Sequence, residues 1–309
     1  MKNSTLVVLI ALILSNCQKT EIDCSKKESY LEQCKILGKV KSIKSQVFEL
    51  TKTENGNYKK RKPKLVSFGH RYYKEINQNG YLTNWINYEN NSEEIKSKSL
   101  LEYNNENIKT SEIIYDKTDK IIFKRIIDVE NNLALKMTDY NENGKIESYS
   151  ENELNDIGQI TKQIQFKDVN KKQKNYSFIY EYKDCKISKS KTLDRNDEII
   201  SEIEYRYNKN EMTYLSSKDK SGLNTYIIKR NEIEPKKIES IKTDKDGKVI
   251  SGKLEITDNF NNIIKEIEND KVTLENIYTY DNKNNWITMK RFKNNKPFEI
   301  VIRNIEYYK

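Results

Sequence analysis

A short turn frame recurs along most of this chain and constrains its fold more than any other feature. In the stretch YNENGKI, residues 140–146, an aromatic residue precedes Asn141, Gly144 follows three positions later, and an apolar residue then returns. An Asp or Asn at the first position can bond its side chain to the backbone two residues on. Gly, Asn or Asp three positions later supplies the left-handed conformation of a type I turn closed by a bulge. Each copy of the frame therefore predicts a β-hairpin.

The frame predicts hairpins from the first third of the chain almost to its end. Between copies, stretches such as FIYEY at residues 178–182 alternate with period 2, as strands do. We therefore expect an all-β fold: a long antiparallel meander of β-hairpin repeats over residues 38–309, forming an elongated curved sheet. A half-closed barrel or a two-layer sandwich is the second choice. The predicted turn residues are Asn77, Gly80, Asp116, Asn141, Gly144, Asn155, Gly158, Asp194, Asp244, Gly247, Asp258 and Asp281.

Composition agrees with a sheet that has water on much of both faces. Hydrophobic residues make up 35% of the chain and charged residues 33%, so a deep core is hard to fill. The 21 tyrosines argue against disorder, because disordered chains lack aromatic residues. Cross-strand aromatic and charge pairs can replace a deep core. The net charge of +9 is spread along the chain, which indicates a solvated face, and we expect no nucleic-acid partner.

The N-terminus carries an export signal. Lys2 precedes the apolar run LVVLIALIL, which predicts a signal peptide over residues 1–16, too short for the roughly 20 residues that span a bilayer. The stretch LSNC that ends at Cys17 resembles the lipobox of bacterial lipoproteins, with Asn16 in place of the usual small residue, a relaxed pattern reminiscent of Bacteroidota. The resemblance implies lipidation of Cys17 and a lipid anchor in the outer membrane, on the cell surface or the periplasmic face. The alternative is an ordinary cleaved signal with a chance cysteine.

A tether over residues 17–25 and a short helix over residues 26–37 are expected next. Ser25 and Glu28 have the spacing of a capping box, and Gly38 fits the position that ends a helix. Export also favours disulfides, and Cys24 with Cys34 is the candidate pair. Ten helical residues span about 15 Å, whereas bridged Cα atoms lie within about 7 Å. The helix and the bridge therefore exclude each other, and the sequence leaves both open.

The repeats resemble a known family. The stretch YTYDNKNNW, residues 278–286, is similar to the YD repeat of the RHS class, whose pattern is Y-x-Y-D-x-x-G-[RN]-[LI]. Asn284 stands in place of the glycine and Trp286 in place of the aliphatic residue. The stretches at residues 38–43 and 303–308 look like YD-like lipoproteins of Bacteroidota. The resemblance covers roughly residues 37–309 and implies an antiparallel β-repeat sheet without an implied activity.

Residues that could carry chemistry are sparse. His70 is the single histidine of the chain, no P-loop, G-x-G-x-x-G, H-E-x-x-H or G-x-S-x-G motif is present, and we expect no catalytic residue, metal or cofactor. The candidate binding surface consists of aromatic residues that could present a platform to a sugar or a protein. The alternative for the two tryptophans is packing over a neighbouring strand. The candidates are Tyr72, Tyr73, Trp85 and Trp286.

Three functional hypotheses follow from the sequence. The first is a non-enzymatic envelope lipoprotein that uses its β-sheet to bind a protein or polysaccharide partner, or to build part of the envelope. The second is an immunity or antitoxin-like lipoprotein that neutralises a toxin. The third is a glycan hydrolase with two carboxyl groups about 5 to 10 Å apart. We expect the first.

Overall fold

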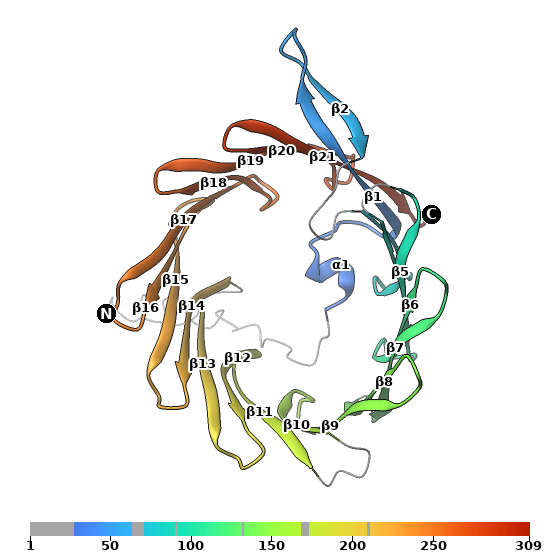
Figure 1. Ribbon diagram of the computed structural model, residues 1–309, viewed down its shortest axis with the longest axis vertical. Helices are drawn as coiled ribbons and strands as arrows, with labels where there is room; N and C mark the ends of the chain where they lie inside the picture. Colours follow the sequence, from blue (N-terminus) through green and yellow to red (C-terminus); the bar gives the residue numbers. More distant parts are fainter. Residues whose placement is uncertain (1–27, 64–70, 90–91, 132, 168–172, 209–210) are drawn as a thin grey trace, which may run out of the picture.

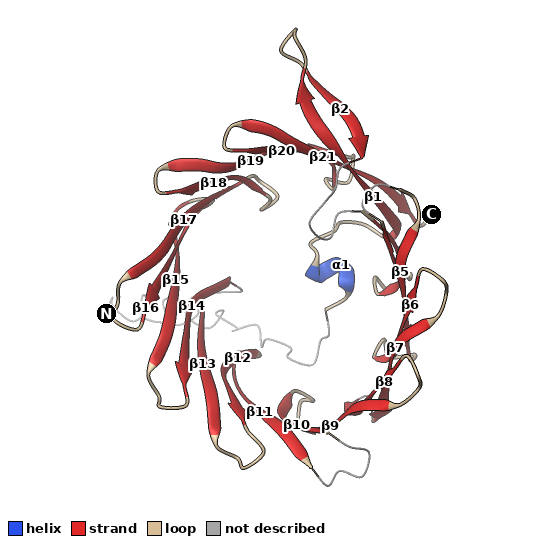
Figure 2. Ribbon diagram, in the orientation of Figure 1, coloured by secondary structure: helices blue, strands red, loops and turns tan. Residues whose placement is uncertain are grey.

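The strands of this protein form a ring, seen end-on in Figures 1 and 2. The computed structural model describes residues 28–63, 71–89, 92–131, 133–167, 173–208 and 211–309. Within these ranges lie one short helix, α1, and strands β1 to β21. In chain order they are α1 (Tyr30–Gln33), β1 (Val40–Lys52), β2 (Tyr58–Pro63), β3 (Tyr72–Ile76), β4 (Leu82–Tyr88), β5 (Ile95–Tyr103), β6 (Lys109–Asp116), β7 (Ile121–Glu130), β8 (Leu133–Asn141), β9 (Ile146–Leu154), β10 (Ile160–Phe166), β11 (Lys174–Lys183), β12 (Lys186–Leu193), β13 (Ile199–Asn208), β14 (Glu211–Asp219), β15 (Asn224–Glu234), β16 (Lys237–Asp244), β17 (Val249–Thr257), β18 (Ile263–Glu268), β19 (Lys271–Tyr280), β20 (Trp286–Lys293) and β21 (Lys296–Tyr307).

The ring is closed by the pairing of the first long strand with the last. From β3 onward each strand pairs antiparallel with the next, and β1 pairs with β3 on one side and β21 on the other. The result is a 20-stranded antiparallel barrel made of β1 and β3–β21. The predicted elongated open sheet is therefore wrong, although the all-β class and the antiparallel hairpins are correct. The hairpin frame encodes neighbouring strands only, whereas closure joins strands at opposite ends of the chain.

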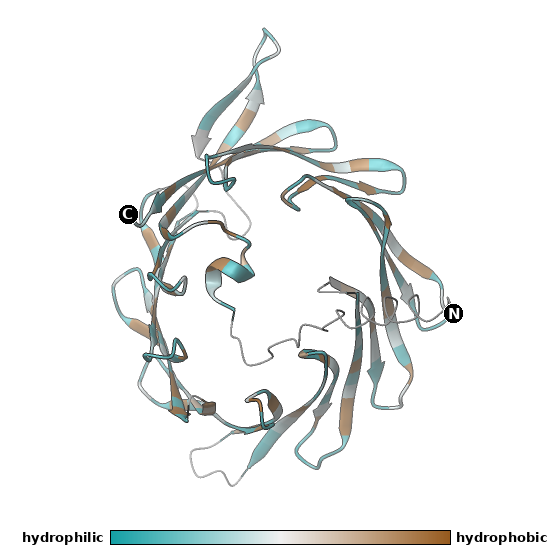
Figure 3. Cartoon of the chain, turned by 180° about the vertical axis from the view of Figure 1, so that it is seen from behind, coloured by the Kyte–Doolittle hydropathy of each residue, from teal (hydrophilic) through white to brown (hydrophobic). Residues whose placement is uncertain are grey.

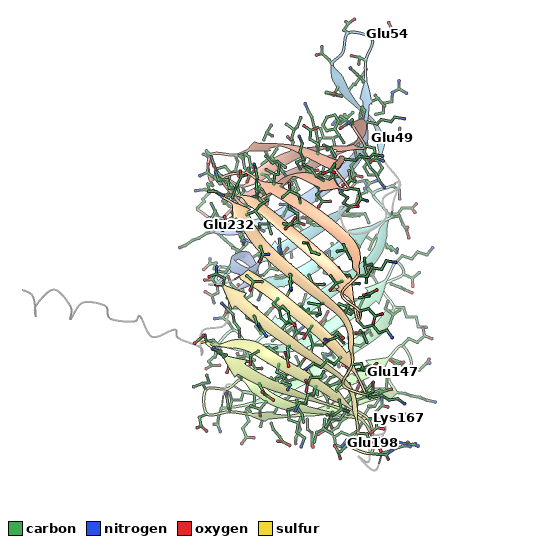
Figure 4. All side chains as sticks on the ribbon, turned by 90° about the vertical axis from the view of Figure 1, so that its left-hand side faces the viewer. Glu49, Glu54, Glu147, Lys167, Glu198 and Glu232 are labelled. Atoms are coloured by element: carbon green, nitrogen blue, oxygen red, sulfur yellow. The ribbon has the colours of Figure 1, made fainter. Side chains whose placement is uncertain are left out.

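Strand β2 lies outside the ring. It pairs with the second half of β1, through Phe48 and residues 50–52, while the first half of β1 pairs with β3. The β1–β2 hairpin therefore projects beyond the barrel, as Figures 1 and 4 show, with Glu54 labelled at its tip in Figure 4. Tyr58 of β2 packs its ring edge-on to Phe292 of β20, with 5.0 Å between the ring centres. This contact joins the start of β2, next to the hairpin turn, to the barrel.

The two rims of the barrel carry different groups of turns. The helix rim is the end where β1 starts and β21 finishes, with the turns at residues 77–80, 104–107, 155–158, 184–185, 258–261 and 281–284. The far rim carries the turns at residues 53–57, 116–119, 141–144, 194–197, 219–222 and 244–247. The strands slant across the wall between these rims (Figure 4). All these turns are short, so long loops are absent from the described part of either rim.

The predicted turn residues lie in hairpin turns that the structure describes. At Asn77 the side-chain oxygen accepts hydrogen bonds from the backbone N–H groups of Asn79 and Tyr81, both at 3.0 Å. The N–H of Gly80 donates to the carbonyl of Asn77 at 2.9 Å and closes the turn. The same side-chain bonds occur at Asp116, Asn141, Asn155, Asp194, Asp244, Asp258 and Asp281, and also at Asn104 and Asp219. The sequence analysis missed the turn at Asp219, which fits the same frame.

Helix α1 lies inside the ring at the helix rim (Figure 1) and is shorter than predicted. Its capping box uses Ser29 and Glu32 rather than Ser25 and Glu28, and Lys35, with φ of 53°, occupies the left-handed position after the helix. The same S-x-x-E spacing occurs twice in succession, so the sequence pattern alone could not choose between them. Leu31 packs with Val40, Ile43, Tyr72, Ile76 and Leu82 in the larger of two dry clusters.

The docking of α1 depends on a close approach at Gly80. The N–H of Leu31 donates to the carbonyl of Gly80 at 3.2 Å, and Gly80 has a φ of +84°. A Cβ added at Gly80 would lie 3.0 Å from the Ser29 hydroxyl oxygen, whereas one added at Gly144, with φ of +71°, would meet nothing within 4 Å. Both glycines thus adopt a positive φ, but only Gly80 has another side chain close to the position that a Cβ would take.

We predict that Gly80→Ala destabilises the barrel more than Gly144→Ala. The left-handed backbone costs an L-residue about 1–2 kcal/mol at either position, and only Gly80→Ala adds a clash with α1. Urea unfolding of both variants checks this, with hydrogen exchange at the Leu31 amide as a second readout. If both variants lose the same unfolding free energy and the exchange rate of the Leu31 amide does not change, α1 does not depend on this contact.

Candidate functional site

The register of the strands assigns each side chain to the inside or the outside of the ring. Residues paired across two strands share a face, as do residues two apart along a strand. Ile43 packs against α1 and therefore faces inward, and its partners Lys74 and Ile305 share that face. Pairs followed around the ring in both directions give one consistent inner face. The candidate functional site is this inner face and its opening at the helix rim.

The inner face of β9–β14 is free of charge at mid-strand. The inward positions there are Ser148, Ser150, Asn152, Gln163, Gln165, Tyr176, Phe178, Tyr180, Ser190, Thr192, Ser201, Ile203, Tyr205, Leu215 and Ser217. Apart from Ser150, which is buried, these side chains are half-buried or exposed. A ring of 20 strands is wider than the side chains of its own wall can fill, which agrees with their exposure.

The outer face of the same strands carries the charge. Its mid-strand positions hold Glu151, Glu153, Lys162, Glu181, Lys189, Lys191, Glu202, Glu204, Arg206 and Lys218. Several form surface ion pairs, such as Lys162 with Glu153 at 2.9 Å and Lys189 with Glu202 at 3.0 Å. Figure 3 shows hydrophilic and hydrophobic residues alternating along the strands, and Figure 4 shows the side chains that cover the wall.

Several inward charges elsewhere on the ring are paired with one another. Arg125 of β7 donates to both carboxylate oxygens of Asp139 at 2.7 and 2.9 Å. Lys253 lies between Glu255 at 2.9 Å and Glu266 at 2.8 Å. Arg230 also contacts Glu255, and Arg291 contacts Glu299, whose side chain is 1% exposed. These carboxylates are held by neighbouring cations.

The predicted aromatic surface is divided between the two faces of the wall. Tyr73 faces outward and donates to Glu75 at 3.0 Å, whereas Tyr72 is buried on the inside. Trp85 and Trp286 also face inward and are half-buried. The four residues do not share one exposed face, and their role in binding stays a prediction. The reason for the division is the period-2 alternation, which sends the neighbours Tyr72 and Tyr73 to opposite faces.

A cluster of cations and aromatic rings lies beneath α1. Lys74 donates to the hydroxyl of Tyr30 at 2.9 Å, and its Nζ lies 4.4 Å from the ring centre of Tyr72 and 4.5 Å from that of Trp85. Burial lowers the pKa of Lys74 and raises the pKa of Tyr30. No sequence pattern indicates this cluster, because its members come from three separate elements, α1, β3 and β4.

A pocket of about 450 Å³ opens beside this cluster at the helix rim. Its lining comes from residues 33–37 after α1, the turn residues 260–262 and 284–286, and the inward side chains Ile43, Arg303 and Ile305. Arg303 stacks on Trp286, with Cζ 3.3 Å from the ring centre, and burial lowers its pKa. We refer to this cavity as the rim pocket.

Asn285 fastens one wall of the rim pocket. Its side-chain oxygen accepts from the N–H of Leu37 at 2.8 Å, and its amide donates to the carbonyl of Leu37 at 2.7 Å and to the Tyr307 hydroxyl at 2.8 Å. The side chain thus pairs with both backbone groups of one residue, as a neighbouring strand would. It holds the segment after α1 against the β19–β20 turn.

The neighbouring Asp281 is held by the same assembly. Its carboxylate accepts from the Tyr307 hydroxyl and from the backbone N–H groups of Lys283 and Asn285. Burial acts to raise the pKa of Asp281, but the hydrogen bond from Tyr307 and those from the backbone outweigh it, and the pKa lies below its ordinary value. Burial and the bond to Asp281 raise the pKa of Tyr307 to about 12.

The cysteines differ from the sequence prediction. Cys34 is an exposed free thiol that borders the rim pocket, so the candidate Cys24–Cys34 disulfide is wrong. Cys185, at the β11–β12 turn, is disulfide-bonded. The sequence analysis weighed only the pair that was near in sequence, because register and turn patterns do not report which distant thiols meet. Cys17, Cys24 and His70 lie outside the described residues.

Metal clusters and membrane-spanning helices are both absent from the described ranges. No group of three or more His, Cys, Asp or Glu side chains suited to a metal ion occurs there. The same residues include no helix long and apolar enough to cross a membrane.

Comparison with solved structures gives distant likenesses in fold. A porin-like protein from Bacteroides uniformis ATCC 8492 has a TM-score of 0.35 at 11% identity, covering 86% of this chain and 96% of that one. A porin-like protein from Bacteroides vulgatus ATCC 8482 has a TM-score of 0.26 at 8% identity, covering 87% and 99%. A eukaryotic initiation factor has a TM-score of 0.34 at 7% identity, covering 87% and 96%. No family model and no curated protein matches the chain.

The resemblance to the YD repeat of the RHS class is wrong, because the pairing of β1 with β21 closes the sheet. The chain is a closed 20-stranded barrel and not a repeat sheet of the RHS type. The Tyr-x-Tyr-Asp stretch before the turn at Asp281 is a hairpin with inward-facing Tyr278 and Tyr280. Such a stretch fits any antiparallel sheet with tight turns, so it does not identify the family.

We predict that Asn285→Ala loosens the segment after α1. The change removes three hydrogen bonds and leaves both backbone groups of Leu37 without them, at a cost of about 1–3 kcal/mol. Thermal unfolding and hydrogen exchange at the Leu37 amide measure the effect. The exposed Asn143→Ala is the control and should leave both readouts near wild type. An Asn285→Ala protein with a protected Leu37 amide would contradict the role of this side chain.

We predict that Asp281 contributes to loss of stability in acid. Its folded pKa lies below the ordinary value of 3.8, so the unfolded chain binds more protons in this range. Its contribution is fully present above that value and is lost as pH falls through the folded pKa. Urea midpoints at pH 7, 4 and 3 should fall less steeply for Asp281→Asn than for wild type. Asp246→Asn, in an exposed turn, should follow wild type, and identical slopes for all three would contradict the prediction.

Proposed function

We propose that this protein is a lipid-anchored envelope protein whose barrel stands in water and has a non-enzymatic binding role. The anchor is Cys17, as the sequence around it indicates, and the barrel holds its partner on the inner face. The observation that carries the proposal is the segregation of charge, with charged side chains outside and a neutral polar wall inside over β9–β14.

The outer wall supports a barrel in water rather than in lipid. A barrel that spans a bilayer needs an outward apolar band about 25 Å tall, and each Lys or Arg at the midplane costs about 2–4 kcal/mol. Here Lys162, Lys189 and Lys218 lie on the outside at mid-strand, together with the glutamates that they contact. A tether at Cys17 would therefore supply the membrane attachment that the wall cannot provide.

The inner wall supports binding rather than catalysis. The inward Glu255 and Glu266 are paired with Lys253 and Arg230, and Asp139 with Arg125, so these carboxylates serve as ion-pair partners. The neutral sector instead presents tyrosines, serines and amides. Tyr supplies rigid contact area and Ser and Asn supply adaptable hydrogen bonds in protein recognition surfaces. A protein or polysaccharide partner with little charge fits this wall.

The proposal is tested by phase partition of the full-length protein in Triton X-114. We expect the wild type in the detergent phase and Cys17→Ala in the aqueous phase, because the lipid is the only membrane attachment. Cys34→Ala is the matched control and should partition as the wild type does. If the Cys17→Ala protein still partitions into the detergent phase, the outer wall of the barrel itself lies in lipid. A wild type in the aqueous phase would refute the anchor.

A further inference from the structure

Arg303 differs from the other inward-facing arginines of the described barrel. Arg125, Arg230 and Arg291 each pair with a carboxylate. Arg303 is in no ion pair among the described residues and contacts Trp286 and Tyr72 instead. Its Nε is buried without a hydrogen-bond acceptor, as are those of Arg230 and Arg291, so the missing carboxylate is what distinguishes Arg303. One inward guanidinium therefore lacks the anion that its counterparts have.

A second cation beside Arg303 increases the imbalance. Lys74 also forms no ion pair with the described residues. Burial lowers the pKa of both cations, and the charge of Arg303 lowers the pKa of Lys74 further. Aromatic contacts compensate only part of the free energy that a cation loses when it is removed from water. The cluster thus holds uncompensated positive charge.

The rim pocket lies against this charge and has the lining of an anion site. Lys35 and Arg303 line it, and no aspartate or glutamate does. The nearby carboxylates of Asp258 and Asp281 are engaged by tyrosine hydroxyls and turn N–H groups. Its volume of about 450 Å³ falls within the range of roughly 300–1,000 Å³ for small-molecule sites.

The other lining residues indicate the chemistry of the ligand apart from its anionic group. The amide-bearing residues Asn262 and Asn284 border the pocket, as do the aromatic residues Phe260 and Trp286. Amides donate and accept hydrogen bonds with hydroxyl groups, and aromatic rings cover the apolar faces of a sugar ring. A carboxylate would meet Arg303 in the planar fork geometry that guanidinium groups prefer.

We propose that the rim pocket binds an acidic monosaccharide, with the carboxylate at Arg303 and the hydroxyls at Asn262 and Asn284. The site is separate from the neutral inner wall and does not depend on the anchor. The pocket prefers an acidic ligand over a neutral one because only the acidic ligand supplies a negative charge for Arg303.

The test is calorimetric titration of the purified full chain with galacturonate and galactose, which differ in a carboxylate. We expect galacturonate to bind at least tenfold more tightly than galactose, and Arg303→Met to abolish this preference. Arg206→Met, on the outer face, should retain it. Equal binding of the two sugars, or no binding of galacturonate, would overturn the proposal.

A second variant keeps the test decisive if Arg303→Met fails to fold. Lys35 is exposed and lines the pocket, so Lys35→Glu adds a negative charge there without altering the core. We expect it to weaken galacturonate binding at least threefold and leave galactose unaffected. Lys39→Glu, exposed and outside the lining, is the matched control. The same galacturonate affinity in both variants would refute the assignment.

Discussion

The structure depends on one pairing, that of β1 with β21. Nine residue pairs, from Val40 with Tyr307 to Glu49 with Glu299, join the beginning of the described sheet to its end. Without them the hairpins would form an open sheet with two exposed edges, which natural proteins avoid because edges template aggregation. Closure removes both edges, and it also creates the inside and outside on which the chemistry of the wall depends.

The dry core of the described barrel is concentrated at this junction. Ile43 and Val47 of β1, both at most 1% exposed, belong to the two hydrophobic clusters found among the described residues. Helix α1 covers the first cluster, and Asn285 holds the segment that follows it. Around the rest of the ring, hairpin turns and cross-strand pairs stabilise the wall, which explains how a chain with mean hydropathy of −0.91 forms so large a sheet.

The two proposals use different consequences of closure. The neutral sector of the inner wall exists because the charged residues of β9–β14 take the alternate positions and face outward. The rim pocket exists because α1 enters the ring and covers Arg303 and Lys74, which removes their water without supplying an anion. One surface is wide and neutral, and the other is small and cationic, so the two are suited to different ligands.

The local structure could be predicted from the sequence, because its causes are local. The Asx turns at Asn77 and Asp281 follow from side chains that bond backbone groups two and four residues away. The antiparallel strands follow from period-2 alternation between such turns. The short helix was expected, but its cap is Ser29 and not the predicted Ser25, because the same S-x-x-E spacing occurs twice in succession. These elements need no knowledge of the remainder of the chain.

Tertiary structure alone decided the closure, the faces and the candidate sites. The bonds between Asn285 and Leu37 join residues 248 apart in sequence, and the Ile43–Ile305 pair closes the ring from its two ends. Alternation fixes that Tyr72 and Tyr73 take opposite faces, but it cannot say which face is enclosed. The free thiol of Cys34 and the unpaired charge of Arg303 likewise depend on which distant segments meet. A repeated local turn carries no information on strand number or ring closure, because those are set by the sum of small twists over the whole sheet.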